Sequence, residues 1–389
     1  MSWEKVKLGD ISCCIQPGPF GSQLHSSDYA DIGTPIIMPK DMIDGRIVHQ
    51  GLIFVPEEHS VRLKRHQVFE GDLMVARKGD VRKCVYITQN ENGWLTGSDC
   101  LKVCLDKSRC DPKFIYYQLR SPFIGQWLEK VSIGATMPSI NTGLLGGIEI
   151  VLPTISEQES IAKILSAYDD LIENNQKQIK LLEEAAQRLY KEWFVDLRIP
   201  GYENTPIIDG VPQGWKDGTL GEIAFFKRGK TITKDQTCEG MVPVVAGGLE
   251  PAYYHNQSNT ASPVITVSGS GANAGFTKMY HTEVWASDCS FVDAQNTDNI
   301  YFAYCVLKNK KSDIDSMQKG AAQPHVYAKD INALEILVPD SLCLAEFENL
   351  VKPFFEKIKA LYQQIELSKE ARDRLLPKLM SGEMEINNG

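Results

Sequence analysis

Few side chains in this sequence stand at the spacings that catalysis requires. Asp111-Pro112-Lys113 is the one Asp/Glu-x-Lys triplet, a spacing that a restriction nuclease needs, but a proline there is typical of the first turn of a helix. Ser98-Asp99-Cys100 and Ser287-Asp288-Cys289 each carry a hydroxyl and a thiol, yet no general base can be argued for either triplet. We therefore interpret the repeated triplet as a shared structural turn.

Phosphate-binding and metal-binding motifs are equally sparse. The glycine-rich run from Gly269 to Gly275 lacks a Gly-Lys-(Ser/Thr) ending and the dinucleotide spacing, so we expect a loop between strands that touches phosphate only through backbone N–H groups. No Pro-Pro dipeptide exists, although an adenine methyltransferase needs one to grip the flipped base. The 7 histidines show no ligand spacing, and the 10 cysteines form no Cys-x-x-Cys pair. The sequence thus predicts no catalytic residue, no metal site and no cofactor in this chain.

Basic residues are the better candidates for function. Some could bind DNA phosphates, and one or two could read guanine edges, as arginine does with two hydrogen bonds. The alternative is an ordinary solvated surface, and the net charge of −9 does not by itself indicate DNA. The candidate DNA-contact residues in the first half of the chain are Arg62, Lys64, Arg65, Arg77, Lys78, Arg82 and Lys83. Those in the second half are Lys227, Arg228, Lys230, Ser268, Ser270, Asn273 and Lys278.

A long internal repeat organises the elements that must position these residues. Eight pairs of identical residues stand 186 positions apart, and further matches upstream keep their order, so the chain is a tandem duplication. The pairs are Gly134 and Gly320, Pro138 and Pro324, Pro153 and Pro339, Ile179 and Ile365, Leu181 and Leu367, Glu184 and Glu370, Arg188 and Arg374, and Leu189 and Leu375.

Each copy combines a mixed globular part with a long helix. Short β-rich runs at 34–38, 72–76 and 264–268 are bounded by turn residues, and short helices are expected at 113–120 and 300–307. The sequence therefore predicts an α+β chain with two similar α/β domains at residues 1–155 and 201–340. A central helix and linker are expected at 156–200, and a C-terminal helix at 341–389.

The two long helices carry coiled-coil seams, in which apolar positions alternate in steps of three and four. The first seam comprises Ile161, Leu165, Tyr168, Ile172, Asn175, Ile179, Leu182, Ala186, Leu189 and Trp193. The second comprises Phe347, Val351, Phe354, Ile358, Leu361, Ile365, Ser368, Arg372, Leu375 and Leu379. We interpret Asn175 as a polar residue that sets the register. Pro353 should kink the second helix or delay its start.

Connectivity predicts the direction of these helices. The first leaves one globular part and arrives at the other, and the second must run back. We therefore expect antiparallel pairing, with a globular part at each end of a rod on the order of 57 Å long, from about 1.5 Å per residue. Such a rod could hold two readers about one turn of DNA apart.

Three motifs resemble those of the specificity subunits of type I restriction-modification enzymes. Residues 152–161, Leu-Pro-Thr-Ile-Ser-Glu-Gln-Glu-Ser-Ile, resemble the family's proline, Glu-Gln and isoleucine signature at a helix start. Residues 114–122 resemble the segment that closes a target recognition domain, and residues 375–383 resemble the family's C-terminal ending. The second copy departs at residues 339–343, where no Glu-Gln pair stands.

The resemblance implies a DNA-reading subunit without chemistry of its own. Each globular part would read half of a bipartite, asymmetric site in double-stranded DNA. The paired helices would dock two methyltransferase subunits that bind S-adenosylmethionine, and ATP-driven restriction subunits would complete the complex. The alternatives are a separate reader chain of a type IIG-like enzyme and a coiled-coil scaffold that binds no DNA. Without an apolar stretch of about 18 residues or a signal-like start, we expect a cytoplasmic protein.

Overall fold

The computed structural model describes residues 3–134, 136–201, 206–208, 210–318 and 324–384. Gly320 of the repeat lies outside these residues. The chain divides into two compact units. Unit 1 comprises residues 1–173 and 366–389, and unit 2 comprises residues 174–365.

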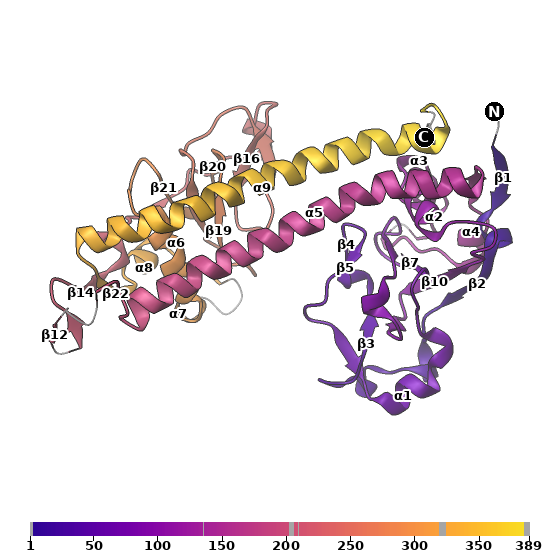
Figure 1. Cartoon of the computed structure of the whole chain (residues 1–389), viewed down its shortest axis with the longest axis horizontal. Helices are drawn as coiled ribbons and strands as arrows, with labels where there is room; N and C mark the ends of the chain where they lie inside the picture. Colours follow the sequence, from indigo (N-terminus) through magenta and orange to yellow (C-terminus); the bar gives the residue numbers. More distant parts are fainter. Residues whose placement is uncertain (1–2, 135, 202–205, 209, 319–323, 385–389) are drawn as a thin grey trace. The chain divides into compact units, whose positions relative to one another are not determined.

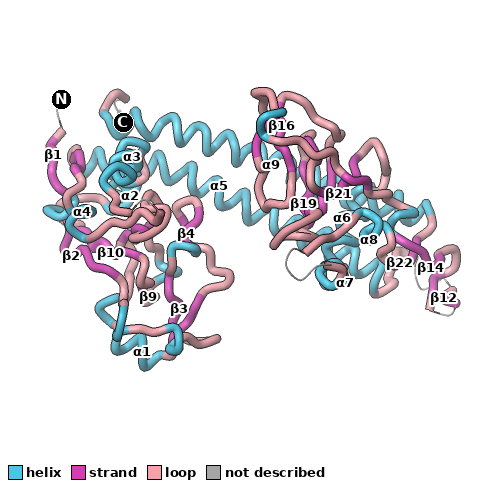
Figure 2. The backbone as a smooth tube through the Cα atoms, turned by 180° about the vertical axis from the view of Figure 1, so that it is seen from behind, coloured by secondary structure: helices cyan, strands magenta, loops and turns pink. Residues whose placement is uncertain are grey.

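Unit 1 is built on a four-stranded sheet with the order β2-β10-β7-β8 (Figures 1 and 2). A three-stranded sheet, β6-β3-β9, and two pairs, β1-β11 and β4-β5, complete it. The strands are β1 Glu4–Lys7, β2 Ser12–Pro17, β3 Thr34–Ile37, β4 Met42–Ile43, β5 Arg46–Ile47, β6 Ile53–Val55, β7 Leu73–Ala76, β8 Cys84–Tyr86, β9 Leu95–Thr96, β10 Cys100–Leu105 and β11 Glu149–Leu152. The short helices are α1 Glu57–Arg62, α2 Pro112–Leu119, α3 Pro122–Val131 and α4 Thr142–Gly146.

Strand alternation explains why unit 1 has a core on both faces of this sheet. Leu73 and Val75 of β7 join a buried cluster that includes Phe114 of α2, whereas Met74 between them joins a second cluster with Val85. Successive strand residues point to opposite faces, so one strand contributes to both clusters. The first cluster also contains Ile161 and Leu165 of α5 (Ile155–Tyr190) and Leu376 and Leu379 of α9 (Ser341–Ser381).

Unit 2 repeats the same topology with different strands. The sheets β15-β21-β18-β19, β17-β16-β20 and β14-β22 correspond to β2-β10-β7-β8, β6-β3-β9 and β1-β11. The strands are β12 Ile207–Ile208, β13 Val211–Pro212, β14 Lys216–Thr219, β15 Lys227–Arg228, β16 Val242–Val245, β17 Tyr253–His255, β18 Val264–Ser268, β19 Thr277–Tyr280, β20 Trp285–Ala286, β21 Cys289–Asp293 and β22 Glu335–Val338. The helices are α6 Ile300–Asn309, α7 Lys311–Ser316 and α8 Ala328–Asn332. The predicted duplication is therefore confirmed in three dimensions.

Helices α5 and α9 pack together, and both seams face inward. Every residue of the first predicted seam is buried or half-buried. Asp169 pairs with Arg372, Asn175 Nδ2 donates to Gln364 Oε1 (3.3 Å) and Trp193 packs against Phe347, so the helices run antiparallel as predicted. At two positions of the second seam, the next residue along the chain is more buried than the predicted one. Phe355 is more buried than Phe354, and Leu376 is more buried than Leu375.

The helix starts differ between the copies. Thr154 and Glu157 form a capping box at the start of α5, with Thr154 N and Oγ1 both donating to the Glu157 carboxylate (2.9 and 2.7 Å). At α9 the Asp340 carboxylate instead accepts from the backbone N–H groups of Leu342 and Cys343 (3.0 and 2.9 Å). The prediction that Pro353 delays this helix was wrong: α9 begins at Ser341 and carries Pro353 on its exposed side.

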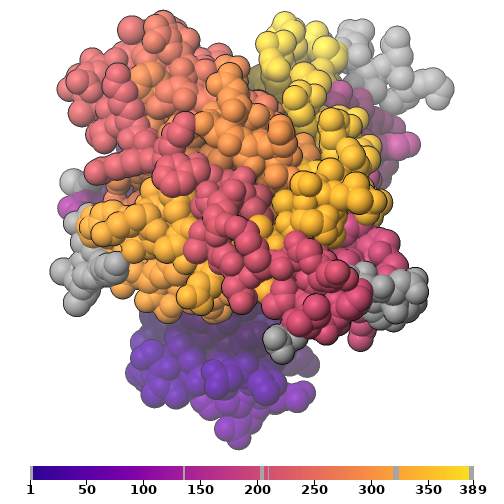
Figure 3. Space-filling view, turned by 90° about the vertical axis from the view of Figure 1, so that its left-hand side faces the viewer, coloured from indigo at the N-terminus to yellow at the C-terminus, as the bar shows by residue number. Residues whose placement is uncertain are grey.

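An aromatic cluster fixes the end of α5 within unit 2. Phe194 packs edge-on against Phe347 of α9, with ring centroids 5.0 Å apart, and stacks on Trp215 at 5.6 Å. Figure 3 shows this end of unit 2, where the segment around β14 lies beside the first turns of α9. Burial of these aromatic rings contributes strongly to the stability of unit 2.

Candidate nucleic-acid interface

Loops at one end of the main sheet of unit 1 are tied together by backbone hydrogen bonds. Arg77 N donates to Asp99 O (2.7 Å) and Gly79 N donates to Pro138 O (3.0 Å). Gly18 packs so tightly that a Cβ there would lie 1.9 Å from Gly97 O, so only glycine fits. We define loop cluster 1 as residues 17–20, 77–80, 97–99 and 137–140.

Unit 2 contains the same frame. Gly269 N donates to Asp288 O (3.2 Å), Gly271 N donates to Pro324 O (3.1 Å), and a Cβ on Gly229 would lie 2.3 Å from Ser287 O. The Cys100 thiol donates to Ile37 O of β3, and the Cys289 thiol donates to Val245 O of β16, each at 3.6 Å. The two Ser-Asp-Cys triplets thus occupy equivalent places, each leading into strand β10 or β21, and their interpretation as a purely structural turn stays a prediction. We define loop cluster 2 as residues 228–231, 269–273, 286–288 and 324–327.

Loop cluster 1 presents cations beside an exposed aromatic ring. The Arg77 guanidinium lies over the Phe20 ring, 5.8 Å from its centroid, and 54% of Phe20 is exposed. Lys78 is exposed, and its Nζ pairs with Asp99 Oδ1 at 3.0 Å. A half-buried arginine and an exposed lysine next to an exposed ring can bind both phosphates and bases.

Arg62, Lys64 and Arg65 extend this surface from the end of α1. All three are exposed. His66 follows them, and its Nδ1 lies 3.1 Å from Pro17 O at the start of loop cluster 1. Burial, and then the neighbouring Arg65, lower the pKa of His66, which favours the neutral ring. The structure thus links Arg62, Lys64 and Arg65 to the loops that carry Arg77 and Lys78.

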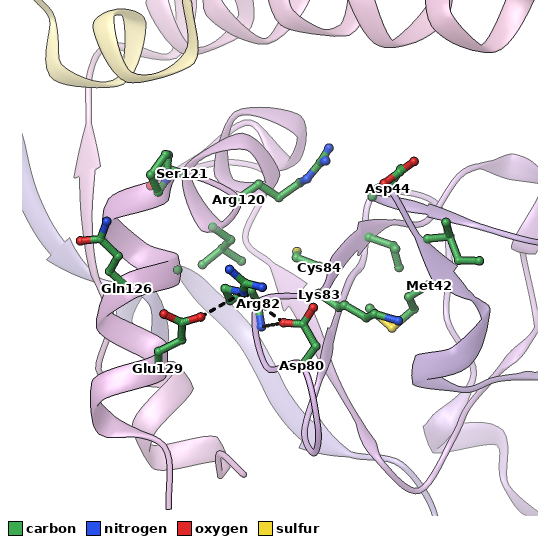
Figure 4. Close-up of a pocket in the computed structure, with 16 residues that line it drawn as sticks. Met42, Asp44, Asp80, Arg82, Lys83, Cys84, Arg120, Ser121, Gln126 and Glu129 are labelled. Carbon is green, nitrogen blue, oxygen red and sulfur yellow. Dashed lines mark hydrogen bonds and ion pairs between the residues drawn. The ribbon is translucent and has the colours of Figure 1, made fainter. Parts of the chain in front are cut away.

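Arg82 and Lys83 are committed to contacts inside unit 1. They line a cavity of about 550 Å³ between β8 and α3 (Figure 4). Arg82 Nε pairs with Asp80 at 3.2 Å and with Glu129 of α3 at 3.3 Å, whereas Lys83 Nζ donates to Pro39 O at 2.9 Å. Both residues thus have partners inside unit 1, and contact of either one with DNA stays a prediction.

Loop cluster 2 encloses a smaller cavity of about 410 Å³. Its lining includes Arg228, Ser270, Asp288, His325 and Tyr327. The Ser270 hydroxyl donates to Asp288 Oδ2, and the His325 and Tyr327 rings stack with centroids 5.9 Å apart. The sequence indicated Arg228 and Ser270 but missed Asp288 and His325, because the triplet containing Asp288 looked purely structural.

The other candidates of the second half are scattered. Lys227 Nζ donates to Asn296, and Lys230 Nζ lies 5.9 Å from the centroid of the Trp285 ring. Lys278 Nζ lies 3.8 Å from a Glu250 carboxylate oxygen. Asn273 lies in the turn of cluster 2, where its carbonyl accepts from Phe276 N (2.9 Å). Ser268 is buried and its hydroxyl donates to Gly247 O (3.2 Å). We therefore withdraw Ser268 from the candidate DNA contacts.

One phosphate-loop pattern passed unnoticed in the sequence. Residues 224–231, Ala-Phe-Phe-Lys-Arg-Gly-Lys-Thr, fit the phosphate-loop spacing except that alanine replaces its first glycine. The structure places Lys227–Arg228 in strand β15, and a three-residue 3-10 helix, Lys234–Gln236, is the next regular element. A phosphate loop must instead open a longer helix, so this segment is no nucleotide site.

Signature residues at the start of α5 have structural roles. The buried Gln158 accepts from Asp111 N at 2.9 Å and donates to Pro153 O at 2.8 Å. Asp111 in turn caps α2 by accepting from Phe114 N at 2.7 Å. Asp111-Pro112-Lys113 therefore begins a helix, as its proline predicted. Within the described ranges, no group of three His, Cys, Asp or Glu could hold a metal ion, and no helix is long and apolar enough to cross a membrane.

Unit 2 also contains a half-buried carboxyl group that should make the stability of the chain depend on pH. Glu348 Oε1 accepts from Phe302 N (2.7 Å) at the start of α6, and burial raises the pKa of Glu348 to about 8. The folded state then holds a proton that the unfolded chain, with a pKa of about 4.3, releases. The free energy of unfolding should therefore fall as the pH rises from about 4.3 to 8, by at most roughly 1.4 kcal/mol per pH unit.

Thermal unfolding between pH 5 and pH 8 tests this expectation. Glu348→Gln keeps the side-chain oxygen that accepts from α6 and removes the titration, so its stability should lose most of this pH dependence. Glu346→Gln, an exposed position on the same helix, is the matched control and should behave as the parent. Equal pH slopes for the parent and Glu348→Gln would refute the assignment.

Known proteins resemble this chain over nearly its whole length. The profile of the type I restriction modification DNA specificity domain matches residues 1–184 and 212–371. The MjaIX specificity subunit of Methanocaldococcus jannaschii is 29% identical, covering 99% of this chain and 94% of that protein. The HindI specificity subunit of Haemophilus influenzae is 20% identical, covering 98% and 99%.

A solved structure shares the fold. The crystal structure of the type I restriction-modification S subunit from M. genitalium aligns with a TM-score of 0.59 and 20% identity, covering 97% of this chain and 96% of that one. Two matches to one family profile agree with the duplicated topology of the two units. The chain therefore belongs to the type I restriction-modification specificity subunits, the non-catalytic subunits that recognise DNA sites for these complexes.

Proposed function

We propose that the two globular parts, residues 1–155 and 201–340, each read one half of a bipartite, asymmetric site in double-stranded DNA. The supporting observation is that the loop clusters share a backbone frame yet carry different side chains. Lys78 and Ser270 occupy equivalent positions, because each forms an isolated antiparallel β-bridge within its own loop cluster. Lys78 bridges to Ser139, and Ser270 bridges to His325. A common frame with different side chains suits two readers of different sequences.

We further propose that helices α5 and α9, with residues 156–200 and 341–389, set the gap between the half-sites and dock two methyltransferase subunits. S-adenosylmethionine and ATP would then be bound by the methyltransferase and restriction subunits. A chain serving a type IIG-like enzyme would have a different partner, and a coiled-coil scaffold would show no salt-dependent DNA affinity.

Removing the two cations of loop cluster 1 tests DNA reading by unit 1. In the complex with its methyltransferase partner, Arg77→Ala with Lys78→Ala should weaken binding to the genomic target by about 10- to 100-fold. The affinity should also depend less on salt, with a log–log slope reduced by about 1–2, because each lost phosphate contact contributes about 0.9. Binding isotherms on duplexes at several salt concentrations would measure both changes.

The matched control removes the same amount of positive charge from another surface of unit 1. Lys5→Ala with Lys7→Ala removes two exposed cations of β1 and should leave affinity and slope unchanged. Mutations in the half-site read by unit 2 should weaken the parent and the variant equally. If the Arg77/Lys78 variant binds as the parent does, loop cluster 1 is only a solvated surface.

A further inference from the structure

We infer that the cavity of loop cluster 2 reads a guanine–cytosine base pair, with Arg228 contacting guanine and Asp288 contacting cytosine. This inference rests on the proposed function. It goes further by naming the base pair and by assigning a role to Asp288. The cavity measures about 410 Å³, and both residues line it.

This cavity holds a donor and an acceptor that do not neutralise each other. Arg228 is exposed at the end of β15, and Asp288 is half-buried in the turn before β21. In the part of the chain that the structure describes, no ion pair within 4 Å joins Asp288 to a cation. The Ser270 hydroxyl, which donates to Asp288 Oδ2, instead fixes the orientation of the carboxylate.

A carboxylate in the cavity favours a base edge over a phosphate as its ligand. A surface that only held phosphates would gain nothing from an acceptor, because like charges repel. Base edges are different: cytosine N4 is a donor that a carboxylate accepts from, and guanine O6 and N7 are acceptors that match the arginine fork. An arginine and an aspartate in one cavity therefore complement a guanine–cytosine pair better than an adenine–thymine pair.

In unit 1 the same backbone frame lacks this combination of a free arginine and an unpaired carboxylate. Strand register places Pro17 at the position of Arg228, because Pro17 pairs with Leu101 and Arg228 pairs with Ser290. Asp99 occupies the position of Asp288, but Lys78 Nζ pairs with it at 3.0 Å. The charge of the Asp99 carboxylate in loop cluster 1 is thus neutralised by Lys78, whereas Asp288 has no such partner. The two units should therefore prefer different base pairs.

The test measures base preference in the complete complex with its methyltransferase subunits. Every base pair of the half-site read by unit 2 is replaced in turn, and binding is compared for the parent, Arg228→Lys and Asp288→Asn. The parent should discriminate against replacement of one guanine–cytosine pair by about 10- to 100-fold. Arg228→Lys keeps the charge but loses the fork, so it should retain most non-specific affinity and lose discrimination at that pair. Asp288→Asn should relax the preference at the same pair.

Controls separate failure of this inference from failure of the proposed function. Lys216→Ala, an exposed β14 position, should leave the preference intact, and unfolding curves verify that each variant is folded. A half-site without guanine–cytosine pairs, or variants with unchanged preference, would overturn the inference while leaving DNA reading in place. Equal losses on all sequences would reduce the cavity to a phosphate contact. Absence of sequence-specific binding by the parent complex would overturn the proposed function as well.

Discussion

Adding four residues to both α5 and α9 at opposed positions is expected to widen the gap of the recognised site by one or two base pairs. The insertions follow Glu173 and Ile365, because the Asn175–Gln364 hydrogen bond shows that these positions face each other. Four residues lengthen a helix by about 6 Å, close to two base-pair steps of about 3.4 Å. Four residues also equal one step of the seam, so the apolar positions continue with a local adjustment.

Sequencing of methylated adenines in cells that carry the lengthened chain would measure the new gap. The bases of both half-sites should stay the same while their separation changes. Insertion into α5 alone is the control: it displaces one seam past the other and should destabilise the chain instead of moving the gap. Unchanged spacing with the double insertion would leave the helices as a docking surface only.

Asp169→Ala is expected to destabilise the chain by about 2–4 kcal/mol, because it leaves a half-buried arginine without its main partner. Asp169 Oδ1 pairs with Arg372 Nη1 at 2.6 Å, and the two side chains are only 12% and 13% exposed. Asp169 Oδ2 also accepts from Tyr117 OH at 2.6 Å. Asp373, which pairs with Arg372 at 2.8 Å but is 63% exposed, compensates only part of the charge.

Urea unfolding of the variant, the parent and a matched control would measure this loss. Arg374→Ala removes an ion pair of the same length, 2.6 Å to Glu370, but its side chains are 78% and 53% exposed. That control should cost about 0–1 kcal/mol. If both variants lose the same stability, burial does not strengthen the Asp169–Arg372 pair. Asp169→Ala with Arg372→Met should recover part of the loss, since the uncompensated charge is gone.

Periodic features were predictable from the sequence, because they depend on many residues at once. The duplication and both seams emerged from repeated spacing, and the buried Asn175 lies where the seam placed it. Arg372 stood out as a polar seam residue, but its partner Asp169 is 203 positions away and no local pattern joins them. Only the antiparallel packing of the helices brings the two together.

The candidate site was less predictable, because charge alone does not show which cations are free. Arg65 and Arg82 look equivalent in the sequence. Glu129, which pairs with Arg82, belongs to helix α3 and stands 47 positions further along the chain. Asp288 escapes prediction for the opposite reason. Its triplet is shared by both copies, as a structural turn would be, although its carboxylate lines the cavity of loop cluster 2.

The division of the chain has a consequence for the order of folding. Unit 2 is one continuous segment, residues 174–365, and can close as soon as it leaves the ribosome. The core of unit 1 packs Ile161 and Leu165 against Leu376 and Leu379, which are synthesised after all of unit 2. The ribosome adds about 5–20 residues per second, so the apolar residues of unit 1 that pack against α9 stay exposed for roughly 10–40 s. The half of the chain that is made first therefore finishes folding last, and that interval is when it most needs protection from aggregation.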